Sequence, residues 1–251
     1  KAVIPVHFAG LPCDMRRIKS IATEFNLKLI EDASHALGAT YEDGSRVGNC
    51  KYSDMTVFSF HPVKGITSGE GGMITTNDET LVRRLLKLRS HGISKGNFEF
   101  SGIGVLDNQL EKPEAAAEDG ELRMWYYEMQ ELGFNYRITD IQSALAISQI
   151  KKIDRFIERR RALVSTYDRA FQALEMIQPT QLAGRRQSSH HIYVIRIDFN
   201  QLGISRHKLM KQLADHGIGT QVHYIPVPLQ PFYESRGYRI TDYPHTDEYY
   251  Q

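Results

Sequence analysis

The sequence predicts an α/β protein built around parallel strands, and three features lead to this prediction. Short apolar strands alternate with amphipathic helices along the first part of the chain. Residues 2–30 follow the order strand, helix, strand, which is a βαβ unit with an expected right-handed crossover. The chain has 251 residues, 41% of them hydrophobic and 24% charged. It can therefore form a substantial core, either as one α/β domain or as a large domain with a small one.

The first part of the chain supplies most of the predicted sheet. The helix of the βαβ unit carries Ile18, Ile21, Ala22 and Phe25 on one face. A later helix is rich in arginine and lysine, which are expected on its solvated face. In chain order, the expected elements are strands 2–8 and 27–30 joined by helix 14–25, a loop or small hairpin 38–49, strands 55–60 and 72–76, and helix 78–90.

The second part of the chain begins with an unusual connection. Residues 92–123 contain several glycines and the run EAAAEDGE, and are expected to form a functional loop or a mobile insertion. Thr139 and Gln142 form a capping box, which predicts a helix whose pattern continues towards Leu174. A smaller second domain should begin near Asp154. Its expected elements are helix 154–174, strand 191–198, helix 206–216 and strand 220–224.

The composition excludes several classes of function. The chain has 31 Lys and Arg against 30 Asp and Glu, a formal net charge of +1, so it shows no nucleic-acid footprint and no polybasic membrane patch. It contains no apolar run of membrane-spanning length and opens with no signal peptide. Cys13 and Cys50 are too few for a disulfide framework and lack the spacing of a metal site. A soluble cytoplasmic protein without a metal is the plain inference.

Two stretches carry residues with chemical potential. The first, residues 57–76 (VFSFHPVKGITSGEGGMITT), places Lys64 and a glycine cluster between two strands. Taken alone it is typical of a surface hairpin, although such a cluster also suits close approach to a ligand. The second stretch places Glu31 and Asp32 at the carboxyl end of a strand, where open α/β sheets bind ligands. An acid there could cap a helix, bind a ribose or hold a cofactor.

Together, EDASHA followed by SFHPVK and GEGG resembles the pyridoxal-phosphate-dependent sugar aminotransferases of the DegT/DnrJ/EryC1/StrS family. The resemblance continues through LGFNYRITDIQSALAISQIKKID (residues 132–154) and GIGTQVHYIPVPLQPFY (residues 217–233). It implies the type I fold of aspartate aminotransferase, with a large, mainly parallel domain over residues 1–154 and a small α+β domain over residues 155–251. It also implies that the chain is an internal fragment in which both domains are truncated.

The resemblance assigns roles to five residues around pyridoxal 5′-phosphate. Lys64 would hold the cofactor as an imine and move protons, which requires an amine that can lose its own proton. Asp32 would keep the ring nitrogen protonated, and His35 would lie beside the ring hydroxyl. Ser59 would bind the phosphate. Asn135 would reach the phosphate of a neighbouring subunit, which implies a homodimer with shared active sites.

The resemblance also suggests a substrate. The runs FHPVK, WYYE and VHYIPV look like those of the UDP-4-keto-sugar aminotransferases of pseudaminic acid synthesis. Such an enzyme moves an amino group from L-glutamate to C4 of a UDP-linked 4-keto-6-deoxy-N-acetylhexosamine. His223 and Tyr224 match a histidine–aromatic pair at the active-site mouth of the family. Trp125 either lines the substrate cleft or packs under the loop.

Other interpretations remain open beside this one. The enzyme could act on another nucleotide-linked keto sugar, or the chain could be a non-catalytic regulator of the same family that binds pyridoxal phosphate. Related dehydratases of the family carry histidine at the position of the lysine. The presence of Lys64 therefore argues against a dehydratase. A Rossmann-type nucleotide binder is disfavoured because no G-x-G-x-x-G opens a helix directly after the first strand.

Overall fold

The computed structural model describes residues 1–95, 125–180 and 186–251. These residues form two compact units, residues 1–196 and residues 197–251. The predicted insertion at residues 92–123 lies outside the described residues from residue 96 onward. The domain boundary expected near Asp154 stays a prediction.

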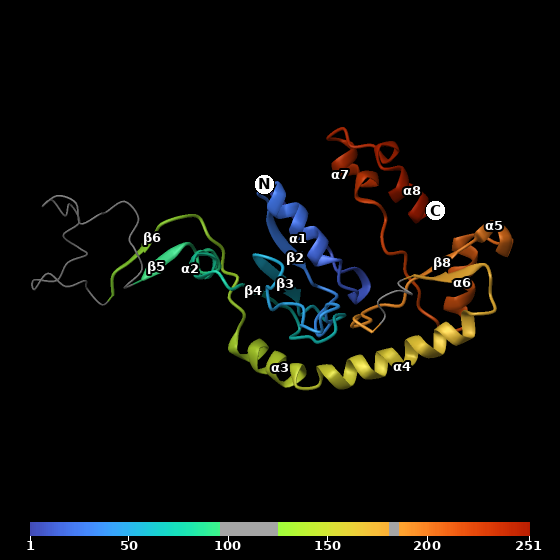
Figure 1. Ribbon diagram of the computed structural model, residues 1–251, viewed down its shortest axis with the longest axis horizontal. Helices are drawn as coiled ribbons and strands as arrows, with labels where there is room; N and C mark the ends of the chain where they lie inside the picture. The colour runs from blue at the N-terminus through green and yellow to red at the C-terminus, as the bar shows by residue number, and fades with distance from the viewer. Residues whose placement is uncertain (96–124, 181–185) are drawn as a thin grey trace, which may run out of the picture. The chain divides into compact units, whose positions relative to one another are not determined.

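A four-stranded sheet forms the centre of the first unit (Figure 1). Its strands, in spatial and chain order, are β1 (Ala2–Val3), β2 (Lys28–Asp32), β3 (Met55–Ser59) and β4 (Gly72–Thr75). The first three strands run parallel, and β4 runs antiparallel to β3. The helix α1 (Met15–Glu24) connects β1 to β2. The predicted βαβ unit and mainly parallel sheet are therefore present.

The first strand is shorter than the predicted strand 2–8. Only Ala2 and Val3 pair with β2, and an isolated bridge from Val6 to Asp32 continues the contact. Pro5 interrupts the ladder because proline has no N–H to donate. The chain then turns through the short 3₁₀ helix η1 (Phe8–Gly10).

The core of the first unit lies between α1 and the sheet. Asp14 caps α1 by accepting the N–H of Arg17 at 3.1 Å. Met15 and Ala22 of this helix are buried in one cluster with residues of β2 and β3. Ile21 and Phe25, which the sequence places on the same apolar face, are 48% and 63% exposed. The apolar face of the helix is thus wider than the surface that the described residues cover.

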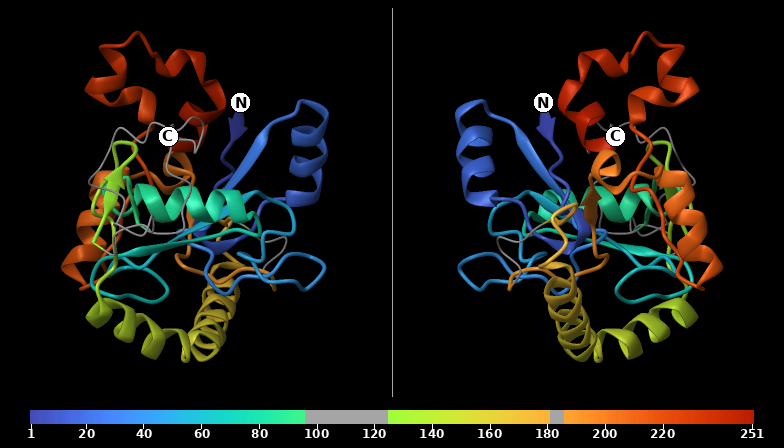
Figure 2. Two further views of the ribbon diagram at one scale, coloured as in Figure 1. Left: turned by 90° about the vertical axis from the view of Figure 1, so that its left-hand side faces the viewer. Right: turned by 90° about the vertical axis from the view of Figure 1, so that its right-hand side faces the viewer.

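The capping box predicted at Thr139 is present. Thr139 Oγ1 accepts the Gln142 N–H at 3.3 Å, and Gln142 Oε1 accepts the Thr139 N–H at 3.1 Å. The helix that it opens, α3 (Asp140–Ile150), is separate from α4 (Ile153–Phe171). The continuous pattern predicted from the sequence therefore forms two helices, and Figure 2 shows the change of direction between them. Ile153 and Ile157 of α4 pack at Gly38, where a Cβ would lie 2.5 Å from Ile157 Cδ1.

Smaller elements complete the first unit. The helix predicted at residues 78–90 is α2 (Glu79–Leu88), in which Leu81, Leu85 and Leu88 are half-buried. β5 (Ile93–Lys95) pairs antiparallel with β6 (Tyr127–Met129), a pairing that the sequence did not predict. β7 (Ile177–Pro179) pairs with β8 (Ile195–Ile197), so the strand expected over residues 191–198 is shortened to three residues.

The second unit is mainly helical. Ser205 caps α6 (Arg206–Asp215) by accepting the Lys208 N–H at 3.3 Å. Arg206 of this helix donates to the carbonyl oxygen of Tyr250 at 2.5 Å and lies over its ring. The strand predicted at residues 220–224 is not formed, since no described segment supplies a hydrogen-bonded partner for it. The helices are α5 (Phe199–Leu202), α6 (Arg206–Asp215), η2 (Val227–Leu229), α7 (Pro231–Glu234), η3 (Ile240–Asp242) and α8 (Pro244–Tyr250).

Within the described ranges, no helix combines the length and the apolar character that a membrane span needs.

The glycine cluster after β3 yields a stability prediction. Gly71 has φ +144°, and a Cβ there would lie 2.8 Å from Ser68 Oγ and 3.1 Å from Ile138 Cδ1. We expect Gly71→Ala to lower the free energy of unfolding by about 2–3 kcal/mol. Gly69 is the matched control: its φ is +85°, but a Cβ at this position would meet no other atom within 4 Å. Gly69→Ala should cost only about 1–2 kcal/mol. Equal losses in urea denaturation would contradict the steric part of this explanation.

Candidate functional site

The register of β2 and β3 decides which side chains share a face of the sheet. Asp32, the last residue of β2, is paired with Val57 of β3. Side chains of paired residues point to the same face and alternate along each strand. Asp32 and Ser59 therefore lie on one face, and Glu31 and Thr56 lie on the other. A carboxylate and a hydroxyl thus share one face at the carboxyl ends of two parallel strands.

Lys64 lies in the loop that begins where β3 ends. Its N–H donates to the carbonyl oxygen of His61 at 2.9 Å, and the His61 N–H donates to Ser59 Oγ at 3.3 Å. These two bonds fold residues 59–64 into a compact turn. Lys64 is half-buried, and its amine makes no hydrogen bond or ion pair with the residues that the structure describes. The amine is therefore available to a ligand.

Asp32 is held mainly through its backbone. Its N–H donates to the carbonyl oxygen of Pro5 at 2.9 Å, and its carbonyl oxygen accepts the His7 N–H at 3.0 Å. Its half-buried carboxylate accepts the Ser34 N–H at 3.0 Å. This last bond is an Asx turn just beyond the strand, and it leaves carboxylate lone pairs for a further donor.

His35 lies three residues beyond Asp32, against the 3₁₀ helix η1. Its Nδ1 accepts the Ala9 N–H at 3.3 Å. Its ring lies 4.4 Å from the ring of His191 and 6.3 Å from that of Phe8, measured between centroids. Because Nδ1 is an acceptor, the ring proton of the neutral imidazole is on Nε2.

A segment distant in sequence surrounds His35, and the sequence analysis assigned it no role. Ser189 Oγ donates to the carbonyl oxygen of His35 at 2.8 Å, and its N–H donates to that of Gly10 at 3.0 Å. Arg160 of α4 donates to the carbonyl oxygens of His190 and His191, at 3.0 and 2.6 Å. Burial lowers the pKa of the Arg160 guanidinium. These contacts depend on the folded chain, so no local sequence signal reveals them.

The other predicted site residues lie elsewhere. Asn135 is exposed, and its backbone forms a bridge with Ser90. Trp125 is 60% exposed, with its ring edge-on to that of Tyr126 at 6.4 Å. His223 and Tyr224 belong to the second unit, where their ring centroids are 3.7 Å apart.

Glu31, adjacent to Asp32, forms a buried network that the sequence analysis missed. Its side chain is 0% exposed and accepts four hydrogen bonds. Tyr41 donates at 2.5 Å, His7 Nε2 at 2.7 Å and Thr56 at 3.2 Å, and Ser53 is the fourth donor. The sequence contained a signal for this network. Glu31 lies two residues after Leu29, on the strand face expected to be buried, and such positions are normally apolar.

The network keeps Glu31 ionised. Burial raises the pKa of Glu31, but the hydrogen bonds from His7, Ser53 and Tyr41 outweigh it and hold the pKa below the usual 4.5. Burial together with the charge of Glu31 raises the pKa of Tyr41, which keeps its hydroxyl protonated as a donor.

The protonation of His7 is subject to opposing influences. Burial lowers its pKa, but interactions with Cys13 and Glu31 raise it to about 9. The Cys13 N–H nevertheless donates to His7 Nδ1 at 3.2 Å, which requires that nitrogen to be unprotonated. We assign the ring from this hydrogen bond, with its proton on Nε2 between the ring and Glu31. Whether the His7 ring is neutral or protonated, its Nε2 donates to the Glu31 carboxylate.

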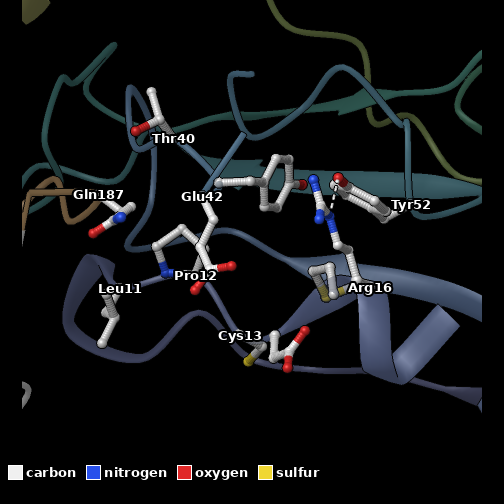
Figure 3. Close-up of a pocket in the computed structure, with 11 residues that line it drawn as sticks. Leu11, Pro12, Cys13, Arg16, Thr40, Glu42, Tyr52 and Gln187 are labelled. Atoms are coloured by element: carbon white, nitrogen blue, oxygen red, sulfur yellow. Dashed lines mark hydrogen bonds between the residues drawn. The ribbon is translucent and has the colours of Figure 1, made fainter. Parts of the chain in front are cut away.

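A surface cavity of about 230 Å³ lies beside this network rather than at Lys64 (Figure 3). Arg16 lines it and donates through Nε to Tyr52 Oη at 3.2 Å, the bond dashed in the figure. None of the predicted cofactor residues is among those that line it, so it does not mark the predicted site. The other lining residues are Leu11, Pro12, Cys13, Asp14, Met15, Thr40, Tyr41, Glu42 and Gln187. Among the described side chains, no cluster of three or more His, Cys, Asp or Glu could hold a metal ion.

Solved structures show what this fold is. PseC of Helicobacter pylori, described as an aminotransferase involved in pseudoaminic acid biosynthesis, matches 94% of this chain and 55% of its own with a TM-score of 0.78 and 30% identity. The putative sugar aminotransferase Spr1654 of Streptococcus pneumoniae, in its PLP-form, matches 100% of this chain and 61% of its own with a TM-score of 0.79 and 28% identity. The fold is that of the type I PLP-dependent transferases, as predicted.

The sequence comparisons define the family within that fold. The model of the DegT/DnrJ/EryC1/StrS aminotransferase family matches residues 1–251, and the chain belongs to this family. A UDP-4-amino-4,6-dideoxy-N-acetyl-beta-L-altrosamine transaminase of Campylobacter jejuni is 36% identical over 93% of the chain and 54% of its own length. The chain spans 60% of the length of the curated relatives that match all of it.

The family's cofactor, pyridoxal 5′-phosphate, agrees with the prediction. The described donor set fits it chemically. A carboxylate suits a pyridine nitrogen, a hydroxyl suits a phosphate, and a lysine amine suits an aldehyde. Asp32, Ser59 and Lys64 supply these three groups from the ends of β2 and β3.

The ionised Glu31 predicts a pH-dependent contribution to stability. Because its pKa is lowered by folding, this contribution is present above about pH 4.5 and is lost as the pH falls through the lowered pKa. At pH 7 we expect Glu31→Gln to lower the free energy of unfolding by about 1.5–3 kcal/mol, because the charged acceptor is lost. The difference from the unsubstituted protein should shrink below pH 4.5. Urea denaturation at several pH values measures it, and a difference independent of pH would show that the charge is unimportant.

Proposed function

We propose that the protein containing this chain is a pyridoxal-phosphate-dependent sugar aminotransferase acting on a nucleotide sugar. The observation that supports it most is that Asp32 and Ser59 share one face at the carboxyl ends of β2 and β3, directly before the Lys64 turn. The chain that carries this arrangement belongs along its whole length to an aminotransferase family. These three groups suit the ring nitrogen, the phosphate and the aldehyde of the cofactor that such a transfer uses.

Each of these residues would have a definite role. When bound, the cofactor supplies an aldehyde that accepts an amino group and a ring that withdraws electrons. The Lys64 amine would hold the cofactor covalently and then carry the proton that moves between substrate and cofactor carbons. Asp32 would hold a proton on the ring nitrogen, and Ser59 would donate to the phosphate. His35 would lie beside the hydroxyl of the cofactor ring. Its Nδ1 accepts the Ala9 N–H, so its Nε2–H would be the group that faces the cofactor.

The proposed substrates are L-glutamate and a UDP-linked 4-keto-6-deoxy-N-acetylhexosamine aminated at C4. The relatedness to the Campylobacter transaminase and to PseC favours this sugar and a place in pseudaminic acid or other surface-glycan biosynthesis. His223, Tyr224 and Trp125 are the proposed substrate-binding residues. We also propose a division into domains at residue 154 and a cytoplasmic location.

Another nucleotide-linked keto sugar and a non-catalytic regulatory role are the alternatives. The half-reaction with L-glutamate distinguishes an aminotransferase from a non-catalytic regulator. An aminotransferase converts its bound cofactor to the amine form, and a regulator that only binds the cofactor does not. The assay uses the longer parent protein loaded with pyridoxal phosphate. Subsequent addition of candidate UDP-keto sugars, one at a time, identifies the sugar by recovery of the original cofactor spectrum.

A homodimer is part of the proposal, with Asn135 reaching the phosphate bound by the other subunit. Exposed apolar side chains of α3 support it, since Ile141 is 85% exposed, Ile147 58% and Leu145 42%. Leu132, Phe134 and Tyr136, which precede the helix beside Asn135, are also more than half exposed. Large apolar side chains exposed along one segment form the kind of apolar surface that is typical of an interaction site.

Disrupting this apolar surface should separate the subunits. We expect Ile141→Lys to convert the parent protein to a monomer. Its binding of pyridoxal phosphate should also weaken, because Asn135 then no longer reaches the phosphate bound by the other subunit. Size-exclusion chromatography with light scattering measures the mass. Ser165→Lys, at an exposed position of α4, is the control and should remain dimeric. A dimeric Ile141→Lys protein would place the interface elsewhere.

Lys64 should be the attachment point of the cofactor. Borohydride reduction of the loaded parent protein should fix pyridoxal phosphate on Lys64, as located by peptide mass spectrometry. Lys64→Ala should abolish this labelling. Lys64→Arg should not restore it, because a guanidinium keeps its protons. Labelling of a different lysine would overturn the assignment.

Asp32 can be tested against a purely structural role. Asn accepts an N–H as well as Asp does, so Asp32→Asn should leave the Ser34 turn and the melting temperature nearly unchanged. It removes the charge that raises the pKa of the ring nitrogen. Single-turnover amino transfer should therefore fall by orders of magnitude. A folded variant with near-normal turnover would show that Asp32 only stabilises the turn.

A further inference from the structure

Glu31 is a charged residue at a position where an apolar one would suffice. It is 0% exposed, and Leu29, on the same strand face, packs in the apolar core. Removing a carboxylate from water costs several kcal/mol, and replacing buried ion pairs by apolar residues is often neutral or stabilising. Filling the core therefore does not explain the carboxylate.

The four donors to Glu31 come from three segments that border β2. His7 follows β1, and Tyr41 lies in the loop after β2. Ser53 precedes β3, and Thr56 lies near the start of that strand. The carboxylate thus joins the neighbours of β2 on both sides, at the residue directly before Asp32.

The same segments hold the main chain of Asp32. His7 contacts both residues, because its ring donates to Glu31 and its N–H donates to the Asp32 carbonyl oxygen. On the other side, Thr56 is paired with Glu31 and Val57 with Asp32. A rotation or shift of β2 that displaced the Asp32 carboxylate would break the Glu31 hydrogen bonds as well. Displacing a binding group by about 1 Å can cost about 100-fold in rate.

We propose that Glu31 is a positioning residue, whose buried carboxylate fixes the end of β2 so that Asp32 is directed at the ring nitrogen of the cofactor. The inference rests on the proposed function of Asp32. It assigns the network of His7, Tyr41, Ser53 and Thr56 to the cofactor site, although these side chains lie on the opposite face of the sheet. Glu31 itself touches neither cofactor nor substrate.

The test measures binding of pyridoxal 5′-phosphate to the longer parent protein, by its dissociation constant and by the visible absorption spectrum of the bound cofactor. Glu31→Gln should weaken binding by about 10- to 100-fold, the range typical of removing a residue that orients a metal ligand. It should also shift the spectrum in the same direction as Asp32→Asn. Tyr41→Phe keeps the ring, removes one donor and should give a smaller change of the same kind. Glu24→Gln, the same substitution at an exposed site of α1, should change neither quantity.

A double-mutant cycle separates positioning from general destabilisation. In the Asp32→Asn background, Glu31→Gln should weaken binding no further, because the residue through which it acts is absent. An equal loss in both backgrounds would overturn the proposal, as would unchanged binding and spectrum in Glu31→Gln. Should Glu31→Gln not fold, the cycle with Tyr41→Phe decides by the same criteria. Failure of the unsubstituted protein to bind the cofactor would instead overturn the proposed function.

Discussion

The register between β2 and β3 is the constraint on which the candidate site depends. Side chains alternate along a strand, so a slip of one residue would exchange the two faces and bury Asp32 in place of Glu31. The pairing of Glu31 with Thr56 and of Asp32 with Val57 excludes that slip. The hydrogen bond from Thr56 to Glu31 is incompatible with that slip, because it needs both side chains on one face. The buried face thus determines what the open face presents.

Local patterns were sufficient to predict several parts of the molecule. The βαβ unit follows from apolar periodicity, and the cap at Thr139 follows from its spacing to Gln142, since both depend on neighbouring residues. Asp32 was predicted from its place at a strand end and from its motif. The family resemblance, rather than geometry, supplied the roles of Lys64 and Ser59, because no local rule distinguishes a cofactor lysine from a solvated one.

The predictions that were wrong had one local cause and several non-local ones. The first strand ends early for a local reason, because Pro5 cannot donate to the ladder. Residues 220–224 have strand-like composition, but a strand exists only with a partner, and partners cannot be deduced from one segment. The role of Arg160 is invisible in the sequence for a similar reason. Its partners are carbonyl oxygens some 30 residues away, which any residue type could supply.

The contacts around His35 have a consequence for how the first unit is assembled during synthesis. The bond from Ser189 to the carbonyl oxygen of His35 joins residues separated by 154 positions, and Ser189 also binds Gly10. A nascent chain that has emerged only as far as α4 lacks these donors, so the carbonyl oxygens of Gly10 and His35 do not yet have these partners. Closing so long a loop is entropically costly and slow. The surroundings of His35 are therefore among the last parts of this unit to become ordered, although β1 and β2, which lead to them, are synthesised well before Ser189.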